Sequence, residues 1–180
     1  EQRKFIQPQE AQDRFKKSLT YLSKLPRFQG AYAHWYEGPS GKVKAFGDKD
    51  NGGDIVETAF LAQALICVRE YYKNGTQEQK EIAALADNIW KEINWKHYTN
   101  GKDVIYWHWS PEHEFGMNHP IQGFDECLIT YVLAASSPTF PIEKQVYDRG
   151  WARSGQIKTD IQKNGYPTEA KHNAHPGEVG

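Results

Sequence analysis

Residues 50–68 read DNGGDIVETAFLAQALICV, and this stretch decides the class of the fold. Its last dozen residues are almost entirely apolar, which predicts a buried helix over about Gly53–Tyr72. Three acids stand at the start of this helix: Asp50, Asp54 and Glu57. Asp54 and Glu57 are separated by about one helical turn, so we expect their side chains to lie on the same side of the helix start.

The same arrangement recurs in residues 123–135, GFDECLITYVLAA, where Asp125 and Glu126 precede another apolar run. This pattern predicts a helix over about Gly123–Ser136. An acid at an N-cap with a glutamate three residues later is a capping box, and the helix dipole favours acids there, so a ligand is not needed to explain these carboxylates. Gly52 and Gly53 favour the other interpretation, because glycines let a ligand approach the backbone closely.

Three further helices are predicted from apolar periodicity and capping signals, over about Pro8–Leu25, Thr76–Ile93 and Ile142–Ala152. Two β-hairpins are predicted between them. One is short and turns at Gly38-Pro39-Ser40-Gly41, and the other joins Trp95–Thr99 to Val104–Trp109 through Asn100-Gly101. Helices separated by long aromatic loops are more typical of an α/α toroid than of a helical bundle.

The predicted architecture is therefore all-α, with residues 1–180 as the N-terminal portion of a single domain. Two helices that are apolar nearly all round cannot cover each other in a chain of five helices, which predicts a further segment that packs on them. Residues 154–180 are rich in Gly, Pro, Lys and His and lack core residues. We expect this tail to be a loop or poorly packed.

The charge of the chain is nearly balanced, with 22 basic and 23 acidic residues and no run of Lys or Arg. This balance argues against nucleic acid and against an anionic membrane as the main partner. No apolar segment reaches the roughly 18 residues that cross a bilayer, so no transmembrane segment is predicted. Cys67 and Cys127 lie in apolar helical runs without CxxC spacing, and we expect both to be buried thiols.

Aromatic residues make up 13% of the chain, and many stand in the loops beside the two acidic helix starts. A sugar stacks its apolar face on aromatic rings and hydrogen-bonds its hydroxyls to carboxylates, amides and imidazoles. Equivalent ends of the inner helices of a toroid open on one face, so both acidic helix starts should share a cleft, and paired carboxylates across a cleft are what a glycosidase requires. The candidate sugar contacts are His34, Trp35, Trp107, His108, Trp109, His119 and Gln122. The tryptophans are explained equally well as residues that close the core beneath the loops.

A metal site is the chemical alternative. Potential ligands occur in the loop that follows the second predicted hairpin: His108, Glu112, His113, Glu114 and His119. Their spacing fits no helical zinc motif, and a loop with Pro and Gly rarely pre-orients ligands. We therefore predict no metal and no cofactor.

Three segments carry a resemblance to a known family: KDNGGDIVETAFLAQALI (49–66), VIYWHWSPEHEFGMNHPIQGFDECLITYVLAASSPTFPI (104–142) and YDRGWAR (147–153). They resemble the bacterial glucoamylase-like (glycoamylase) family, which is related to β-1,2-glucan-degrading endoglucanases and to the hydrolase-like region of cyclic β-1,2-glucan synthases. The resemblance covers about Arg27–Arg153. It implies an (α/α)6 toroid of roughly twice this length, in which the remaining C-terminal half packs against this chain.

The resemblance also implies roles for the acids. The pocket acids that it marks are Asp50, Asp54, Glu57 and Glu126. In the related glucanases hydrolysis inverts the anomeric carbon, a glutamate matching Glu126 is the general acid, and the general base lies C-terminal to residue 180. We expect Glu126 to stay protonated among apolar neighbours, and Asp54 and Glu57 to bind sugar hydroxyls. The family often has Trp-Asn where this chain has Phe124-Asp125, which changes the stacking face and adds a charge.

The predicted function is a glycoside hydrolase that acts on a glucan by inversion, with a β-1,2-linked glucan as the candidate substrate. Two alternatives stay open: a non-catalytic glycan-binding protein of the same fold, and a helical scaffold whose aromatic loops bind protein. The resemblance also implies export to the periplasm or the cell surface.

Overall fold

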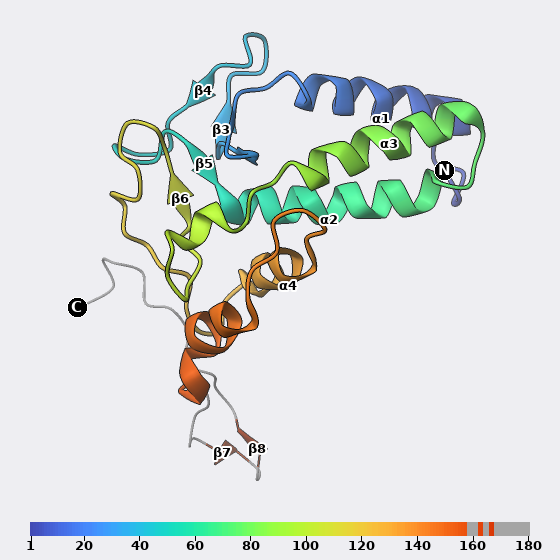
Figure 1. Ribbon diagram of the computed structural model, residues 1–180. Coiled ribbons are helices and arrows are strands. Elements are labelled where there is room, and N and C mark those ends of the chain that lie inside the picture. Colours follow the sequence, from blue (N-terminus) through green and yellow to red (C-terminus); the bar gives the residue numbers. More distant parts are fainter. Residues whose placement is uncertain (158–161, 164–165, 168–180) are drawn as a thin grey trace.

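The computed structural model describes residues 1–157, 162–163 and 166–167, and this part of the chain is mostly helical (Figure 1). The α-helices are α1 (Pro8–Leu22), α2 (Ile55–Tyr72), α3 (Gln77–Lys91) and α4 (Leu128–Ser136). A π-helix spans Val146–Trp151, and short 3-10 helices span His97–Thr99 and Arg153–Gly155. The predicted helical class is confirmed.

Every strand in the described residues is two residues long, and each pairs antiparallel with one other strand. Three pairs are local: β1 (Arg27–Phe28) with β2 (Ala31–Tyr32), β3 (Trp35–Tyr36) with β4 (Val43–Lys44), and β7 (Gln162–Lys163) with β8 (Tyr166–Pro167). The fourth pair joins distant segments, β5 (Gly53–Asp54) and β6 (His108–Trp109). The β3–β4 pair is the short hairpin predicted at Gly38–Gly41.

Helices α1, α2 and α3 form the larger packed unit, in which α3 runs between α1 and α2 and contacts both (Figure 1). The turn from α2 to α3 ends at Thr76, whose hydroxyl accepts the Gln79 N–H while the Gln79 side chain accepts the Thr76 N–H. This is the predicted capping box. The core between these helices contains Leu19, Leu65, Tyr72, Ile82 and Ile89.

A second core lies where α2 meets α4 and the loops that connect them. It includes Ile55, Ala59, Trp95, Tyr98 and Tyr131, all of them fully buried. The Tyr131 hydroxyl accepts the Ile105 N–H at 3.0 Å and donates to the Ile121 carbonyl at 2.8 Å. This one side chain therefore links α4 to the backbone at Ile105 and at Ile121.

The hairpin predicted over Trp95–Thr99 and Val104–Trp109 is wrong. Asn100 and Gly101 do adopt the left-handed turn conformation, with φ of 51° and 68°. The residues before this turn form a 3-10 helix instead of a strand, because their N–H groups bond back along the chain, as from Thr99 to the Lys96 carbonyl at 3.2 Å. The residues after the turn supply β6, which pairs with β5.

Helix boundaries differ from the predicted ones mainly at α4, which begins at Leu128 and not at Gly123. Asp125 Oδ1 accepts the Cys127 N–H at 2.8 Å, so an Asx turn occupies the place of the first helical turn. The fifth predicted helix, Ile142–Ala152, is present but is a π-helix over Val146–Trp151. Most of the predicted tail 154–180 lies outside the described residues.

The prediction that α2 is buried all round is wrong. Phe60 is 42% exposed and Tyr71 is 48% exposed, and Cys67 between them is exposed too, so of the two predicted buried thiols only Cys127 is buried. These residues share one side of α2, where Cys67 and Tyr71 line a hollow together with Phe5 of the N-terminal segment and Phe15 of α1. None of the described helices is both long and apolar enough to cross a membrane.

Candidate functional site

The predicted acids meet in a cavity of about 590 Å³ that opens at the start of α2. Its lining comes from five parts of the chain that are distant in sequence. The lining residues are His34, Phe46, Gly47, Asp48, Lys49, Asp50, Asp54, Glu57, Trp107, Gly116, Met117, His119 and Glu126. A cavity of this size with converging polar groups is the usual form of a small-ligand site.

The backbone around β5 and β6 brings these segments together. Asp54 stands opposite His108 in the strand pair, and the Ile55 N–H donates to the Trp107 carbonyl at 3.0 Å. The Trp107 N–H in turn donates to the His119 carbonyl at 3.0 Å. The rings of Trp107 and His119 stack with centroids 5.0 Å apart, so a flat aromatic wall stands beside the first turn of α2.

Asp54 is the N-cap of α2 and has a full set of partners. Its Oδ1 accepts the N–H groups of Val56 and Glu57, both at 3.0 Å, and its Oδ2 lies 2.8 Å from Nδ1 of His34. The Asp54 side chain is 1% exposed. Asp54 therefore acts as a helix cap, as the capping interpretation predicts, and its contact with Nδ1 of His34 fixes that ring in the cavity wall.

Asp50 lines the same cavity as Asp54, but its carboxyl group has few hydrogen-bond partners. Its backbone is held by a tight turn, in which the Phe46 N–H donates to the Asp50 carbonyl at 2.8 Å and the Asp50 N–H donates to the Gly47 carbonyl at 3.0 Å. Its Oδ1 is buried and accepts no hydrogen bond from the described residues. Burial, and next the negative charge of Asp54, raise the pKa of Asp50 to about 6, while His34 opposes them.

His108 is a structural neighbour of the cavity and not one of its lining residues. Its side chain is fully buried, and its Nε2 accepts the Gly52 N–H at 3.0 Å. Burial lowers the pKa of His108 to about 4, and the charges of Asp54 and His113 act in opposite directions on it. The imidazole is therefore neutral near pH 7 and holds the loop that carries Asp50.

The space beside Gly52 and Gly53 is filled by the protein itself. A Cβ atom on Gly52 would lie 2.3 Å from the Trp109 carbonyl oxygen, and one on Gly53 would lie 2.1 Å from the Tyr98 hydroxyl. These glycines let β6 and Tyr98 approach β5, and the interpretation that they make room for a ligand is wrong.

Glu57 and Glu126 reach the cavity from the first turn of α2 and from the segment just before α4. Both residues are exposed in the described part of the chain. The apolar enclosure expected around Glu126 is therefore absent among the described residues, whereas Asp50 is buried.

Three other predicted sugar contacts do not line the cavity. Trp35 is 46% exposed and packs against His34 and Phe46, whose rings lie 5.4 and 4.9 Å from its own, so it stands at the cavity rim. Trp109 packs against His97 at 4.7 Å, and Gln122 is half-buried away from the lining.

The sequence did not single out Phe46, Asp48, Lys49 and Met117, which also line the cavity. Phe46, Asp48 and Lys49 stand in the loop directly before the acidic segment, so the nearness of Asp50 was the available signal. Lys49 Nζ donates to the Gly116 carbonyl at 3.4 Å and joins this loop to the 116–119 loop across the cavity.

One potential metal group occurs among the described residues: Asp125, Glu126 and Cys127 have ligand atoms within 4.8 Å of one another. Burial, together with the charges of Asp125 and Glu126, raises the pKa of the Cys127 thiol, so this sulfur stays protonated and is a poor ligand. The histidine-rich set weighed from the sequence does not gather into such a group within the described residues.

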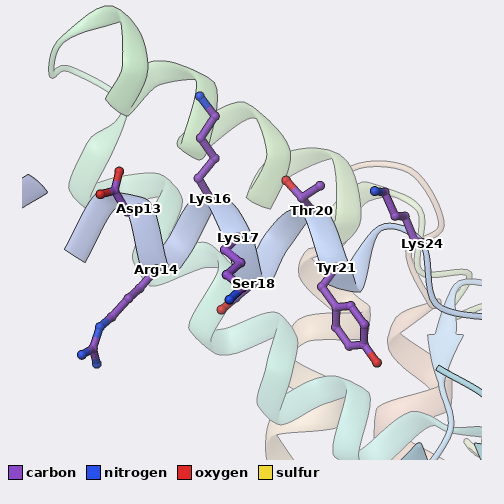
Figure 2. A pocket seen from close by; sticks show the side chains of 8 residues that line it. All are labelled: Asp13, Arg14, Lys16, Lys17, Ser18, Thr20, Tyr21 and Lys24. Carbon is purple, nitrogen blue, oxygen red and sulfur yellow. The ribbon is translucent and has the colours of Figure 1, made fainter. Parts of the chain in front are cut away.

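A larger hollow of about 820 Å³ runs along the outer side of α1. Figure 2 shows its side chains spread on both sides of the helix, with Lys16 and Thr20 on one side and Arg14 and Tyr21 on the other. It contains four cationic residues and a single acid, Asp13, so it lacks the paired carboxylates of the cavity at α2.

Replacing Asp54 by alanine is expected to cost about 2 kcal/mol or more of unfolding free energy, because two cap bonds and the His34 contact are lost together. Asp54→Asn should cost less, since an amide oxygen still accepts the two N–H groups. Urea unfolding of the complete protein measures both, with Asp13→Ala on exposed α1 as the control. Equal stability of the alanine and asparagine variants would contradict the capping role.

Comparison with known proteins agrees with this description. The Glycoamylase family model, described as "Putative glucoamylase", matches residues 118–176. The exo beta-1,2-glucooligosaccharide sophorohydrolase (non-reducing end) of Parabacteroides distasonis is 42% identical over 154 residues, which are 84% of this chain and 21% of that protein.

Solved structures match over nearly the whole chain. An endo-beta-1,2-glucanase from Chitinophaga pinensis, in complex with sophorotriose and glucose, has a TM-score of 0.92 and 48% identity, over 96% of this chain and 41% of its own. A beta-1,2-glucanase from Parabacteroides distasonis has a TM-score of 0.86 and 34% identity, over 95% of this chain and 27% of its own. The chain thus spans about two fifths or less of the length of these relatives.

These matches define the class of the chain as part of a larger, mostly helical barrel. They also confirm the resemblance to the glucoamylase-like family and to its β-1,2-glucanase relatives.

Proposed function

We propose that the protein is a glycoside hydrolase that cleaves β-1,2-linked glucans with inversion. The observation that carries this proposal is that two separate helix starts bring Glu57 and Glu126 to one cavity, beside the stacked rings of Trp107 and His119. Carboxylates that line one aromatic-walled cavity suit a substrate with many hydroxyls and a reaction that needs proton transfer. The names of the relatives, which are β-1,2-glucan hydrolases, favour the linkage.

In this proposal Glu126 is the general acid that protonates the leaving glycosidic oxygen, while water attacks the anomeric carbon from the opposite face. Trp107 stacks on a glucose ring, and Glu57, His34 and His119 bind hydroxyl groups. A second carboxylate takes the proton of the attacking water. An inverting site needs the two carboxyl groups roughly 6.5–9.5 Å apart, which leaves space for that water.

The rest of the barrel is the proposed partner of this chain. The exposed apolar side of α2, with Phe60 and Tyr71, and the exposed Leu128 and Val132 of α4 suit a packed helical neighbour better than water. We infer that this neighbour also encloses Glu126 and contributes the general base. Export to the periplasm or cell surface, where glucan polymers are met, is the location that we propose with this activity.

The direct test is incubation of the complete protein with β-1,2-, β-1,3- and α-1,4-linked glucans, followed by measurement of new reducing ends. We expect turnover of the β-1,2-linked glucan alone, and the first product detected by NMR should have the α-anomeric configuration. Binding of the β-1,2-linked glucan without new reducing ends would instead identify a non-catalytic glycan-binding protein.

A further inference from the structure

The two buried carboxyl groups of the cavity, Asp50 and Asp54, are not equivalent. Asp54 has hydrogen-bond partners on both oxygens, among them two N–H groups of the α2 start, where the helix dipole favours a negative charge. Asp50 is only 8% exposed, lines the cavity, and has a buried Oδ1 without a partner among the described residues. An unpaired carboxylate at such a place is costly, so one of the two groups should carry a proton.

No described cation neutralises Asp50. The nearest basic atom is His108 Nε2, at 3.6 Å from Asp50 Oδ1. This nitrogen accepts the Gly52 N–H at 3.0 Å, so it has no proton of its own and the imidazole is neutral. The ring of His34 is bonded to Asp54, and the ammonium of Lys49 donates to the Gly116 carbonyl.

We propose that in mildly acidic solution Asp50 is a neutral carboxylic acid that donates a hydrogen bond to an oxygen of the bound glucan, and that its burial beside the Asp54 anion favours this protonated form. This inference rests on the proposed function for the identity of the ligand. The sequence predicts both acids as sugar contacts, whereas in this proposal they have different roles. Asp50 binds the ligand, and Asp54 influences the protonation state of Asp50.

The surroundings of Asp50 agree with a neutral group. Burial and the charge of Asp54 raise the pKa of Asp50 to about 6, and His34 lowers it by less. The other charged or titratable groups that line the cavity are three acids and two basic residues: Asp48, Glu57, Glu126, Lys49 and His119. Because the turn at Phe46–Asp50 holds the backbone at both ends, the Asp50 carboxyl is presented in one place.

The ligand part of the proposal is tested by calorimetric binding of sophorose to the complete protein carrying Glu126→Gln, which prevents turnover. We expect the dissociation constant to rise about tenfold between pH 5 and pH 7, as Asp50 loses its proton. Adding Asp50→Asn should abolish this rise, because an amide donates at every pH. Adding Asp48→Asn, which removes an exposed acid of the same cavity, should leave the rise in place.

The protonation part is tested without any ligand, by thermal melting of the complete protein and its Asp50→Asn variant. An acid whose pKa is higher in the folded protein than its ordinary 3.8 destabilises the fold as pH rises from about 4 to about 6, and the loss persists above that range. We therefore expect equal melting temperatures near pH 4 and a variant that melts roughly 5 °C higher at pH 7.5. Asp54→Asn should make this difference smaller and complete it at lower pH, because loss of the Asp54 charge lowers the pKa of Asp50 in the folded protein.

The outcomes separate the two proposals. Equal melting of wild type and Asp50→Asn at pH 7.5 would overturn the neutral carboxyl, whatever the activity of the protein. A pH-dependent melting difference with a pH-independent dissociation constant would overturn the donated hydrogen bond. Absence of sophorose binding in every variant would overturn the ligand part together with the proposed function, and the melting comparison would still decide whether Asp50 is protonated.

Discussion

Replacing Glu126 by glutamine is expected to lower kcat on β-1,2-glucan by roughly 10²–10⁴-fold, with a much smaller change in KM. Glutamine has the size and polarity of glutamate but has no proton to give to the leaving oxygen. The loss should be much smaller on an aryl β-glucoside whose leaving group needs no protonation. Reducing-end assays on the polymer and release of the chromophore from the aryl glucoside measure the two losses.

The matched control for this experiment is Glu143→Gln, the same change at an exposed position outside the cavity. Its kcat should equal that of the wild type. Equal losses on the polymer and on the aryl glucoside would show that Glu126 acts in binding or folding, and near wild-type turnover by a folded Glu126→Gln variant would remove it from the mechanism.

Features that depend on neighbouring residues were predictable from the sequence. The apolar run of α2, the Thr76 capping box and the turn between β3 and β4 all follow from residues within a few positions of one another. The gathering of Glu57 and Glu126 could be anticipated because both acids stand at the same kind of helix start. Local signals therefore place the elements and the general position of the cavity.

Features that depend on long-range pairing were not predictable. The pairing of β5 with β6 joins residues more than fifty positions apart, and neither strand has an alternating pattern long enough to be detected. That pairing decides which histidine is buried, since His108 faces the Gly52 N–H inside the protein while His34 and His119 face the cavity. It also decides which carboxylate is left without partners.

The exposed side of α2 has a different cause. Its apolar residues predicted burial, and burial of an apolar side requires a neighbour. Phe60, Cys67 and Tyr71 stay exposed in the described part of the chain, and the solved relatives match this chain over only about two fifths of their own length. The pattern of a helix indicates that a side should be covered, but it does not identify the segment that covers it.

The β5–β6 pairing leads to the second large prediction, that Gly53→Ala destabilises the protein by about 3 kcal/mol or more. Gly53 is fully surrounded: an added Cβ would lie 2.1 Å from the Tyr98 hydroxyl, 2.9 Å from the Phe28 Cβ and 3.2 Å from the Ala31 Cβ. Tyr98 cannot move aside easily, because it is fully buried and its hydroxyl donates to the Phe28 carbonyl at 2.8 Å.

Because Asp54 follows Gly53 directly, relief of this overlap by a shift of β5 would displace the cap of α2 and with it the cavity acids. Urea unfolding should therefore show the loss of stability, and glucan turnover should fall with it. Gly38→Ala is the control, since a Cβ on that glycine meets nothing within 4 Å and should change stability little. Adding Tyr98→Phe to Gly53→Ala removes the closest atom and should recover part of the stability, although the Phe28 contact remains. A Gly53→Ala variant as stable as the wild type would mean that β5 does not pack against Tyr98 as described, and the positions of Asp50 and Asp54 would have to be reconsidered with it.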